Sequence, residues 1–352
     1  MGRVISVFLV FAALCALVIG GLLLVSYKNP GLISPIPKVF GASSNIVGNN
    51  WFPKNLSGFP HQGNSLSLSA NSVLIADYDS GQIIFQKDLN HRQPAASTVK
   101  MMTALVAFEN ADLNREFTVS AKAAKIGEDS MGLGEGEKLN LRDLLYGLIL
   151  VSGNDAAVTI ADGVSGNEDE FVKLMNQKAV FLGLSDTKFI NASGLDEDGR
   201  EQYSTAHDLV VIAHYLWENH PEFREISGTV HWTLDANLGH KAFDLYNDTN
   251  LLTTYPGVRG IKPGFTWEAG LCLVTYAENG GKRLLAVILG SDDRRGEMKE
   301  LLDYGFGTYG IHVFHPGLDL VREVSPIVKR AKPQAMPKSS TVSAEASRSA
   351  GN

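Results

Sequence analysis

The hydrophobic pattern divides the chain into an apolar N-terminal run, a long region of strand and helix patterns, and a polar C-terminal tail. Residues Val4 to Ser26 carry no charge, and about 20 helical residues span the hydrocarbon core of a bilayer. A cleaved signal peptide has a shorter apolar region of about 7–15 residues. The run therefore predicts an uncleaved transmembrane signal anchor over residues 1–28.

The charges beside this run predict its orientation. Arg3 precedes the run and Lys28 follows it, and this slight asymmetry favours an N-terminus inside the cell. We therefore expect a single-pass protein of the cell membrane whose catalytic domain lies outside the cytoplasm. The alternative that remains open is a signal that is removed.

The middle region begins and ends with strand patterns and has helical patterns between them. Asp79-Ser80-Gly81 indicates a turn between the first two strands. The predicted strands are Ser72–Tyr78, Gln82–Gln86, Ala269–Ala277 and Leu284–Leu289, and the predicted helices are Thr98–Asn110, Leu141–Leu150, Glu168–Leu182 and Thr205–Asn219. The simplest arrangement of these elements is an α/β (α+β) fold with one antiparallel sheet and a helical lobe attached to it. Strands from both ends of the region join in this sheet.

The flanking segments differ in composition from this region. Residues 29–64 are rich in Pro, Gly, Asn and Ser, which is typical of a linker or an extension along the surface. The region 65–315 is then the catalytic domain. Residues 316–352 are rich in Ser, Ala, Lys and Pro and predict a disordered tail.

Composition excludes several classes of function. With 44% apolar residues the chain can bury a large core, and its net charge of −7 argues against a nucleic-acid binder. Cys15 and Cys272 alone cannot form a zinc site. His207 and His214 are seven residues apart, which is not the i, i+4 spacing of a helical zinc pair. We expect no metal and no cofactor, and the apolar neighbours of Cys272 indicate a core residue rather than a nucleophile.

The first candidate chemistry is the pair Ser97 and Lys100. A helix beginning near Ser97 places positions i and i+3 on one face. A serine hydroxyl needs a neighbouring base to become a nucleophile, and a lysine can be that base if burial or nearby positive charge lowers its pKa. The pattern S-x-x-K alone also occurs by chance.

Two further short motifs strengthen this hypothesis. Ser152-Gly153-Asn154 follows the predicted helix 141–150 and offers a hydroxyl for proton relay and an amide for a peptide carbonyl. Lys262-Pro263-Gly264 offers a cation at a strand edge, followed by a glycine that lets a ligand approach the backbone closely. Either motif alone is also compatible with an ordinary turn.

The three motifs, in this order along the chain, resemble those of a known group of enzymes. S-x-x-K, S-x-N and K-x-G are the set shared by β-lactamases and penicillin-binding proteins. Their flanks, together with Asn191–Leu195 and Thr205–Asp208, resemble the D-alanyl-D-alanine carboxypeptidases of peptidase family S11, the low-molecular-mass penicillin-binding proteins. The resemblance covers roughly residues 65–310.

The resemblance implies a β-lactamase/DD-peptidase-like fold and a serine carboxypeptidase that removes the terminal D-alanine of peptidoglycan stem peptides. Such an enzyme acts in peptidoglycan biosynthesis, cell wall organisation and cell shape, and β-lactam antibiotics inhibit it covalently. The implied roles are nucleophile, acylation base and proton relay for Ser97, Lys100 and Ser152. The implied substrate-binding residues are Asn154, Lys262, Gly264, Phe265 and Thr266, with the backbone N–H groups of Ser97 and Phe265 as the oxyanion hole.

One departure from the family concerns Pro263, where relatives usually have Thr. Proline removes a hydroxyl and a backbone donor, and losing one contact to the substrate carboxylate weakens binding by about 1.5–3 kcal/mol. Thr266 matches a threonine common in the family and is expected to replace this contact in part. A D,D-endopeptidase and a non-catalytic cell-wall or penicillin-binding protein therefore remain alternatives. A β-lactamase is disfavoured because no E-x-x-L-N segment follows Asn154.

Overall fold

A computed structural model describes residues 51–56, 66–249 and 251–315. Its central feature is a five-stranded sheet of order β2-β1-β9-β8-β7, in which every neighbouring pair is antiparallel. The strands are β1 (Ser72–Asp77), β2 (Ile83–Lys87), β7 (Val258–Thr266), β8 (Gly270–Asn279) and β9 (Lys282–Ser291). Because β1 pairs directly with β9, the predicted closure of the sheet from both ends of the region is confirmed.

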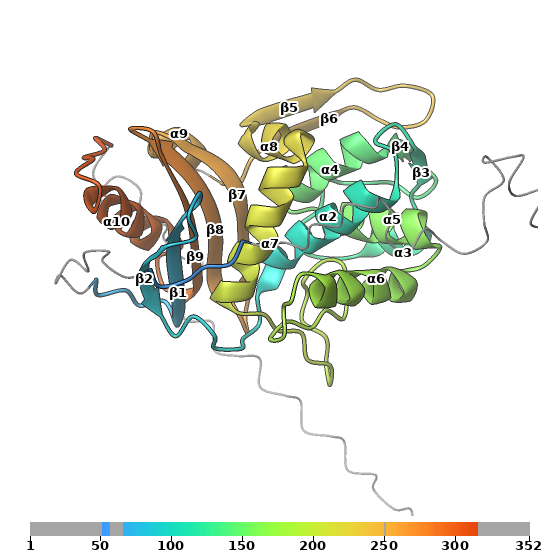
Figure 1. Cartoon of the computed structure of the whole chain (residues 1–352). Helices are drawn as coiled ribbons and strands as arrows, with labels where there is room; N and C mark the ends of the chain where they lie inside the picture. Colours follow the sequence, from blue (N-terminus) through green and yellow to red (C-terminus); the bar gives the residue numbers. More distant parts are fainter. Residues whose placement is uncertain (1–50, 57–65, 250, 316–352) are drawn as a thin grey trace, which may run out of the picture. The chain divides into compact units, whose positions relative to one another are not determined.

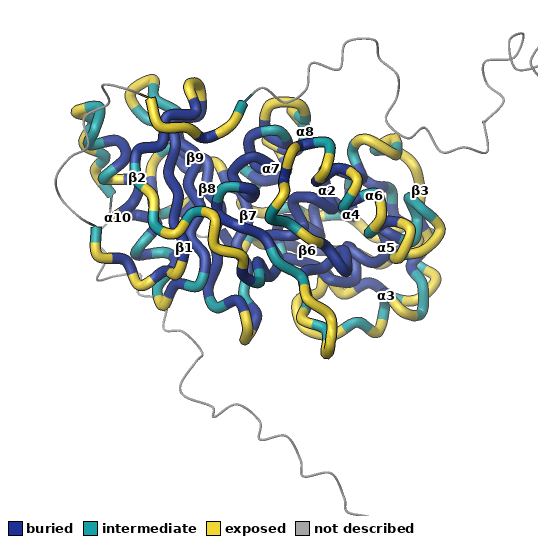
Figure 2. Tube along the Cα trace, turned by 60° about the horizontal axis from the view of Figure 1, so that its bottom comes forward, coloured by how far each residue is buried: buried dark blue, intermediate teal, exposed yellow. Residues whose placement is uncertain are grey.

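Both faces of the sheet are covered, as Figure 1 shows, with α10 (Arg294–Gly307) on one face and α7 (Ala206–Asn219) on the other. Side chains alternate between the two faces of a strand. Accordingly, Leu74 belongs to the core under the helical lobe, whereas Ile75 belongs to the core under α10. This two-sided burial explains why the middle of the sheet is buried throughout in Figure 2.

The helical lobe lies between β2 and β7 in the sequence. Its helices are η1 (Ala96–Val99), α2 (Lys100–Asn110), α3 (Ala121–Lys125), α4 (Leu141–Leu150), α5 (Asn154–Ser165), α6 (Glu168–Phe181), α7 and α8 (Pro221–Gly228). The side chains of Asn140, Asn167 and Thr205 cap α4, α6 and α7 by accepting a hydrogen bond from a backbone N–H of the first turn. These caps explain why the predicted helix starts agree closely with the structure.

Smaller elements complete this part of the chain. Two hairpins, β3 (Glu116–Thr118) with β4 (Lys138–Asn140) and β5 (His231–Leu234) with β6 (Phe243–Tyr246), lie outside the main sheet, and α9 (Leu251–Thr254) precedes β7. Sequence analysis predicted none of these smaller elements, and it also gave no range for β7, α3, α5, α8 or α10.

The short segment 51–56 lies against the globular region. The Trp51 ring stacks on His214 of α7 with ring centroids 4.0 Å apart, and the Lys54 backbone bonds to Gly81 and Ile83 beside β2. The predicted anchor, most of the predicted linker and all of the predicted tail lie outside the described residues. Within the described ranges, no helix combines the length and apolarity needed to cross a membrane.

Candidate active site

Ser97 lies in η1, the tight turn that leads directly into α2. Ala96 adopts a left-handed conformation with φ of 48°, which bends the chain just before the serine. Gly194 makes this bend possible, because a Cβ atom there would lie 2.1 Å from the Ala96 carbonyl oxygen. The predicted helix over Thr98–Asn110 therefore begins with a 3-10 turn, and this turn places Ser97 and Lys100 on one face.

Lys100 is fully buried among neutral acceptors. Its Nζ lies 2.8 Å from Ser97 Oγ and 2.8 Å from Asn154 Oδ1, and it donates to the Ser193 carbonyl at 2.6 Å. Burial, and then the positive charge of Lys262, hold the pKa of Lys100 well below its usual range. This lowered pKa favours the neutral amine, which is the form that can accept the proton of the Ser97 hydroxyl.

Ser152 and Asn154 approach the same place from the start of α5. Ser152 has a φ of 60°, an uncommon conformation for serine that concentrates at functional sites. Its buried Oγ has no hydrogen-bond partner within the described part of the chain. Asn154 bonds to Lys100 through Oδ1 and donates from Nδ2 to the Gly127 carbonyl at 3.0 Å. The predicted S-x-N motif thus joins the serine–lysine pair through its asparagine.

Strand β7 forms the opposite wall and contains the third motif. Lys262 is fully buried, its Nζ donates to the Pro263 carbonyl at 3.2 Å, and burial lowers its pKa to about 8. A Cβ atom on Gly264 would lie 3.0 Å from Ser97 N and 3.1 Å from Thr98 N. Only glycine therefore lets β7 approach the serine this closely. The motif lies within the strand rather than in a turn, and β7 is an edge of the sheet, where proline is tolerated.

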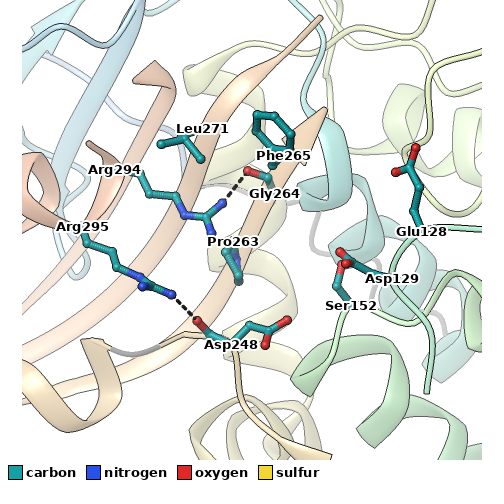
Figure 3. Close-up of a pocket in the computed structure, with 10 residues that line it drawn as sticks. All are labelled: Glu128, Asp129, Ser152, Asp248, Pro263, Gly264, Phe265, Leu271, Arg294 and Arg295. Atoms are coloured by element: carbon teal, nitrogen blue, oxygen red, sulfur yellow. Dashed lines mark hydrogen bonds between the residues drawn. The ribbon is translucent and has the colours of Figure 1, made fainter. Parts of the chain in front are cut away.

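A cavity of about 310 Å³ opens between these walls. Figure 3 shows Ser152 and Asp129 on one side and Pro263, Gly264 and Phe265 on the other. Sequence analysis missed five charged residues that line it, namely Glu128, Asp129, Asp248, Arg294 and Arg295. The cavity thus carries charges of both signs, and its lining includes Ser152 and Gly264, which belong to the second and third motifs.

The two arginines lie at the start of α10. Arg294 Nη1 donates to the Gly264 carbonyl at 2.8 Å, and Arg295 Nη2 donates to the Asp248 carbonyl at 3.2 Å. Burial raises the pKa of the Asp248 carboxyl although the charge of Lys262 opposes the shift. The doublet Arg294-Arg295, three residues after the end of the buried strand β9, was the signal in the sequence that could have identified this cationic side.

The residues 128–133 are held in place by Asp155. Its carboxylate accepts hydrogen bonds from Met131 N at 3.0 Å, Leu133 N at 2.8 Å and Ser130 Oγ at 2.6 Å. Asp155 directly follows Asn154 in the first turn of α5. It therefore couples the position of Glu128 and Asp129 at the cavity to the helix that positions the S-x-N motif.

Comparison with known proteins agrees with this arrangement. The sequence profile of the D-alanyl-D-alanine carboxypeptidase family (Peptidase_S11) matches residues 60–293. The chain belongs to this family. It is 35% identical to D-alanyl-D-alanine carboxypeptidase DacF of Bacillus subtilis over 76% of this chain and 69% of that protein. It is 37% identical to DacB2 of Mycobacterium tuberculosis over 67% of this chain and 82% of that protein.

Solved structures show the same relationship. Penicillin-binding protein D2 of Listeria monocytogenes, in its cefotaxime-bound form, superposes with a TM-score of 0.63 at 31% identity and covers 69% of this chain and 99% of its own. The predicted DD-peptidase-like fold is confirmed, and the resemblance found in the sequence is a family membership. The alternatives of a D,D-endopeptidase of the same family and of a non-catalytic cell-wall or penicillin-binding protein are not favoured.

The remaining residues that we singled out in the sequence take different places in this S11 domain. Phe265 lines the cavity, whereas Thr266 Oγ1 accepts a hydrogen bond from Ala269 N at 3.1 Å and stabilises the turn after β7. Cys272 is buried and unpaired, and burial raises the pKa of its thiol to about 11. Its side chain is a core residue, as the sequence indicated. His207 and His214 both lie on α7.

Proposed function

We propose that this carboxypeptidase works through an acyl-enzyme at Ser97, with Lys100 as the base. The observation that carries the proposal is the 2.8 Å contact between Ser97 Oγ and the fully buried Lys100 Nζ. The amine can be neutral because burial and the charge of Lys262 lower its pKa. A neutral lysine removes the hydroxyl proton as Oγ attacks the carbonyl of the penultimate D-alanine.

The next step needs stabilisation of the oxyanion and a proton for the leaving amine. The backbone N–H groups of Ser97, at the start of a helix, and of Phe265, on the edge strand, are the candidate oxyanion hole. The Ser152 hydroxyl is the candidate relay from Lys100 to the departing D-alanine, because it is buried and unpartnered among the described residues. Water then hydrolyses the acyl-enzyme and returns the proton to the serine.

The substrate's terminal carboxylate belongs at the cationic side of the cavity. Arg294 and Arg295 line the cavity and supply positive charge there, and the buried Lys262 adds its charge from behind Pro263. Asn154 is the candidate to hold the peptide on the opposite wall. Pro263 contributes no hydroxyl, so we propose that the carboxylate depends on these cations more than on a side-chain hydroxyl. β-Lactam antibiotics carry a carboxylate next to a reactive amide and would acylate Ser97 in the same orientation.

We further propose that residues 1–28 anchor the enzyme in the cell membrane as a single helix, with residues 65–315 outside the cytoplasm and residues 29–64 as a tether. The uncharged run Val4 to Ser26 supports this proposal. Peptidoglycan lies outside the membrane, so this orientation brings the domain to its substrate. Protease added to intact cells should then degrade the domain, and protection of the domain would contradict the orientation.

The decisive experiment is the intact mass of the full chain in detergent after incubation with benzylpenicillin, together with release of D-alanine from a peptide ending in D-Ala-D-Ala. We expect a covalent adduct and D-alanine release in the parent and neither in Ser97→Ala. Ser185→Ala, which removes an exposed hydroxyl outside the cavity, is the matched control and should behave like the parent. An adduct that persists in Ser97→Ala would exclude Ser97 as the nucleophile.

A further inference from the structure

A second cavity, of about 670 Å³, opens beyond the far end of β7. Its walls are residues 195–203, which lie between α6 and α7, together with residues 92–94 and the turn residues Trp267 and Glu268. Leu195 follows Gly194, whose backbone packs against the residue before Ser97. Trp267 follows the strand that lines the catalytic cavity. The second cavity is therefore reached from the serine by continuing along β7.

The lining of this cavity is strongly acidic. Carboxylates at Asp196, Glu197, Asp198, Glu201 and Glu268 outnumber the guanidinium groups of Arg92 and Arg200. Both arginines are engaged in ion pairs, Arg92 with Asp186 at 2.6 Å and Arg200 with Glu197 at 2.7 Å. Because Asp186 lies outside the lining, the carboxylates of the cavity retain a clear excess of negative charge.

Two further side chains point to a ligand rather than to a merely solvated acidic loop. Trp267 is 65% exposed at the cavity, and its ring meets the Phe265 ring edge-on with centroids 5.6 Å apart. Gln93 is only 7% exposed and lines the cavity, and its Nε2 has no hydrogen-bond partner among the residues described. An unpaired buried amide donor is costly unless a ligand carbonyl accepts from it.

These groups together match one kind of ligand. Carboxylates attract a cation, an exposed indole face adds a cation–π contact, and a buried amide N–H recognises a peptide carbonyl. We propose that this cavity is a subsite for the free side-chain amine of a diamino acid, located on the amino-terminal side of the D-Ala-D-Ala unit. The proposal rests on the proposed function.

The orientation of the substrate in the catalytic cavity also places its amino-terminal side at this second cavity. With the terminal carboxylate at Lys262 and Arg294 and the reacting carbonyl at Ser97, the preceding residues must leave past Phe265 toward Trp267. A stem peptide whose side-chain amine is free would then place a protonated amine among the carboxylates. A cross-linked stem, whose amine is acylated, would lose that charge. The subsite would thus favour un-cross-linked stems and hence carboxypeptidase over endopeptidase action.

The test compares two peptides that differ only in this charge. One ends in L-Lys-D-Ala-D-Ala, and the other has the same sequence with the lysine Nε acetylated. We expect the full-length enzyme to release D-alanine from the free amine with a kcat/KM about fivefold higher, since partly exposed charge pairs and cation–π contacts are individually modest. The preference should weaken with added salt.

Variants then assign the preference to the cavity. In the double variant Asp196→Asn/Asp198→Asn, and in Trp267→Ala, the ratio of the two kcat/KM values should fall toward one. The ratio cancels any common change in folding or acylation. Asp235→Asn, which removes an exposed carboxylate from the loop after β5, is the matched control and should retain the parent's ratio.

The possible failures are distinguishable. A ratio near one in the parent, or a preference that survives in both cavity variants, would overturn the subsite while leaving the enzyme's activity established. If the parent releases D-alanine from neither peptide and benzylpenicillin leaves no adduct, the proposed function itself fails and the subsite falls with it.

Discussion

The helical lobe buries two lysines in opposite ways. Lys178 of α6 is 2% exposed, donates to Glu109 Oε1 at 2.6 Å and lies 4.2 Å from the centre of the Tyr215 ring. Lys100 is also fully buried, but the three hydrogen-bond partners of its amine are a hydroxyl, a side-chain amide and a backbone carbonyl. One amine has a negatively charged partner, whereas the other has neutral partners and a second cation nearby.

This difference separates a structural lysine from a reactive one. A buried cation is stable when an opposite charge offsets its lost hydration. Lys178 has that partner, and Glu109 opposes the decrease that burial causes in its pKa. For Lys100 the largest effect after burial is the repulsion from the positive charge of Lys262, which lowers the pKa of Lys100 further. Burial alone therefore does not distinguish Lys100 from Lys178. The two lysines differ in that only Lys178 is bonded to a carboxylate, whereas Lys100 is bonded to the hydroxyl of the candidate nucleophile.

The largest effect is expected on removing the Lys100 amine, and removal of the Lys178 amine is the comparison. Lys100→Met should reduce the rate of acylation by benzylpenicillin by about 10³-fold, because the serine loses its base. Lys178→Met should leave this rate near that of the parent. Stopped-flow acylation measures both, with circular dichroism as the check of folding. Equal losses in the two variants would remove the functional distinction between the lysines.

The second effect is on stability rather than on rate. Glu109→Gln leaves Lys178 buried without a full counter-charge and should lower the free energy of unfolding by about 1–3 kcal/mol. Urea denaturation measures this change, and acylation by penicillin should be unaffected. Glu116→Gln is the matched control, because the Glu116 side chain is 61% exposed and its ion pair with Lys138 spans 3.6 Å. An unchanged stability in Glu109→Gln would mean that the ring contacts alone hold Lys178.

The third effect concerns the cation beside Lys100. Lys262 has a pKa of about 8, so its positive charge is present below that pH and is lost above it. The kcat/KM for a D-Ala-D-Ala peptide should therefore fall as the pH rises through about 8. In Lys262→Arg the charge persists, since arginine stays protonated to above about pH 12. The ratio of variant to parent kcat/KM should then rise about thirtyfold between pH 7 and pH 9.5. Parallel pH profiles of the two proteins would show that Lys262 does not cause the decrease in activity at high pH.

Four of the five strands of the sheet, the main helices and the three motifs could be predicted from the sequence because each has a local signal. Strand patterns, capping residues and the i, i+3 spacing of Ser97 and Lys100 are all visible along the chain. The distinction between Lys100 and Lys178 was not predictable in this way. It depends on Glu109 and Asn154, which come from other helices.

The cationic side of the cavity was missed for a similar reason. Arg294 reaches Gly264 across the sheet from the start of α10, and Asp248 enters from the segment before β7. α10 itself was overlooked although its buried residues Met298, Leu301 and Leu302 recur at helical spacing. Long-range contacts of this kind leave no periodic signal, so the charges that surround a motif have to be read from the fold.

The smallest effect is expected at Pro263, the residue that departs from the family. Its carbonyl accepts from Lys262 at 3.2 Å, and its ring offers no hydroxyl to the cavity that it lines. Pro263→Thr restores a hydroxyl next to the proposed carboxylate site and should raise kcat/KM for a D-Ala-D-Ala peptide by about three- to tenfold, the value of one added hydrogen bond. The rate with a peptide whose terminal carboxylate is amidated is the control and should not change. If kcat/KM rises with both peptides, the effect of Pro263 does not depend on the substrate carboxylate. Proline would then act through the conformation of β7 rather than through a missing hydrogen bond to the carboxylate.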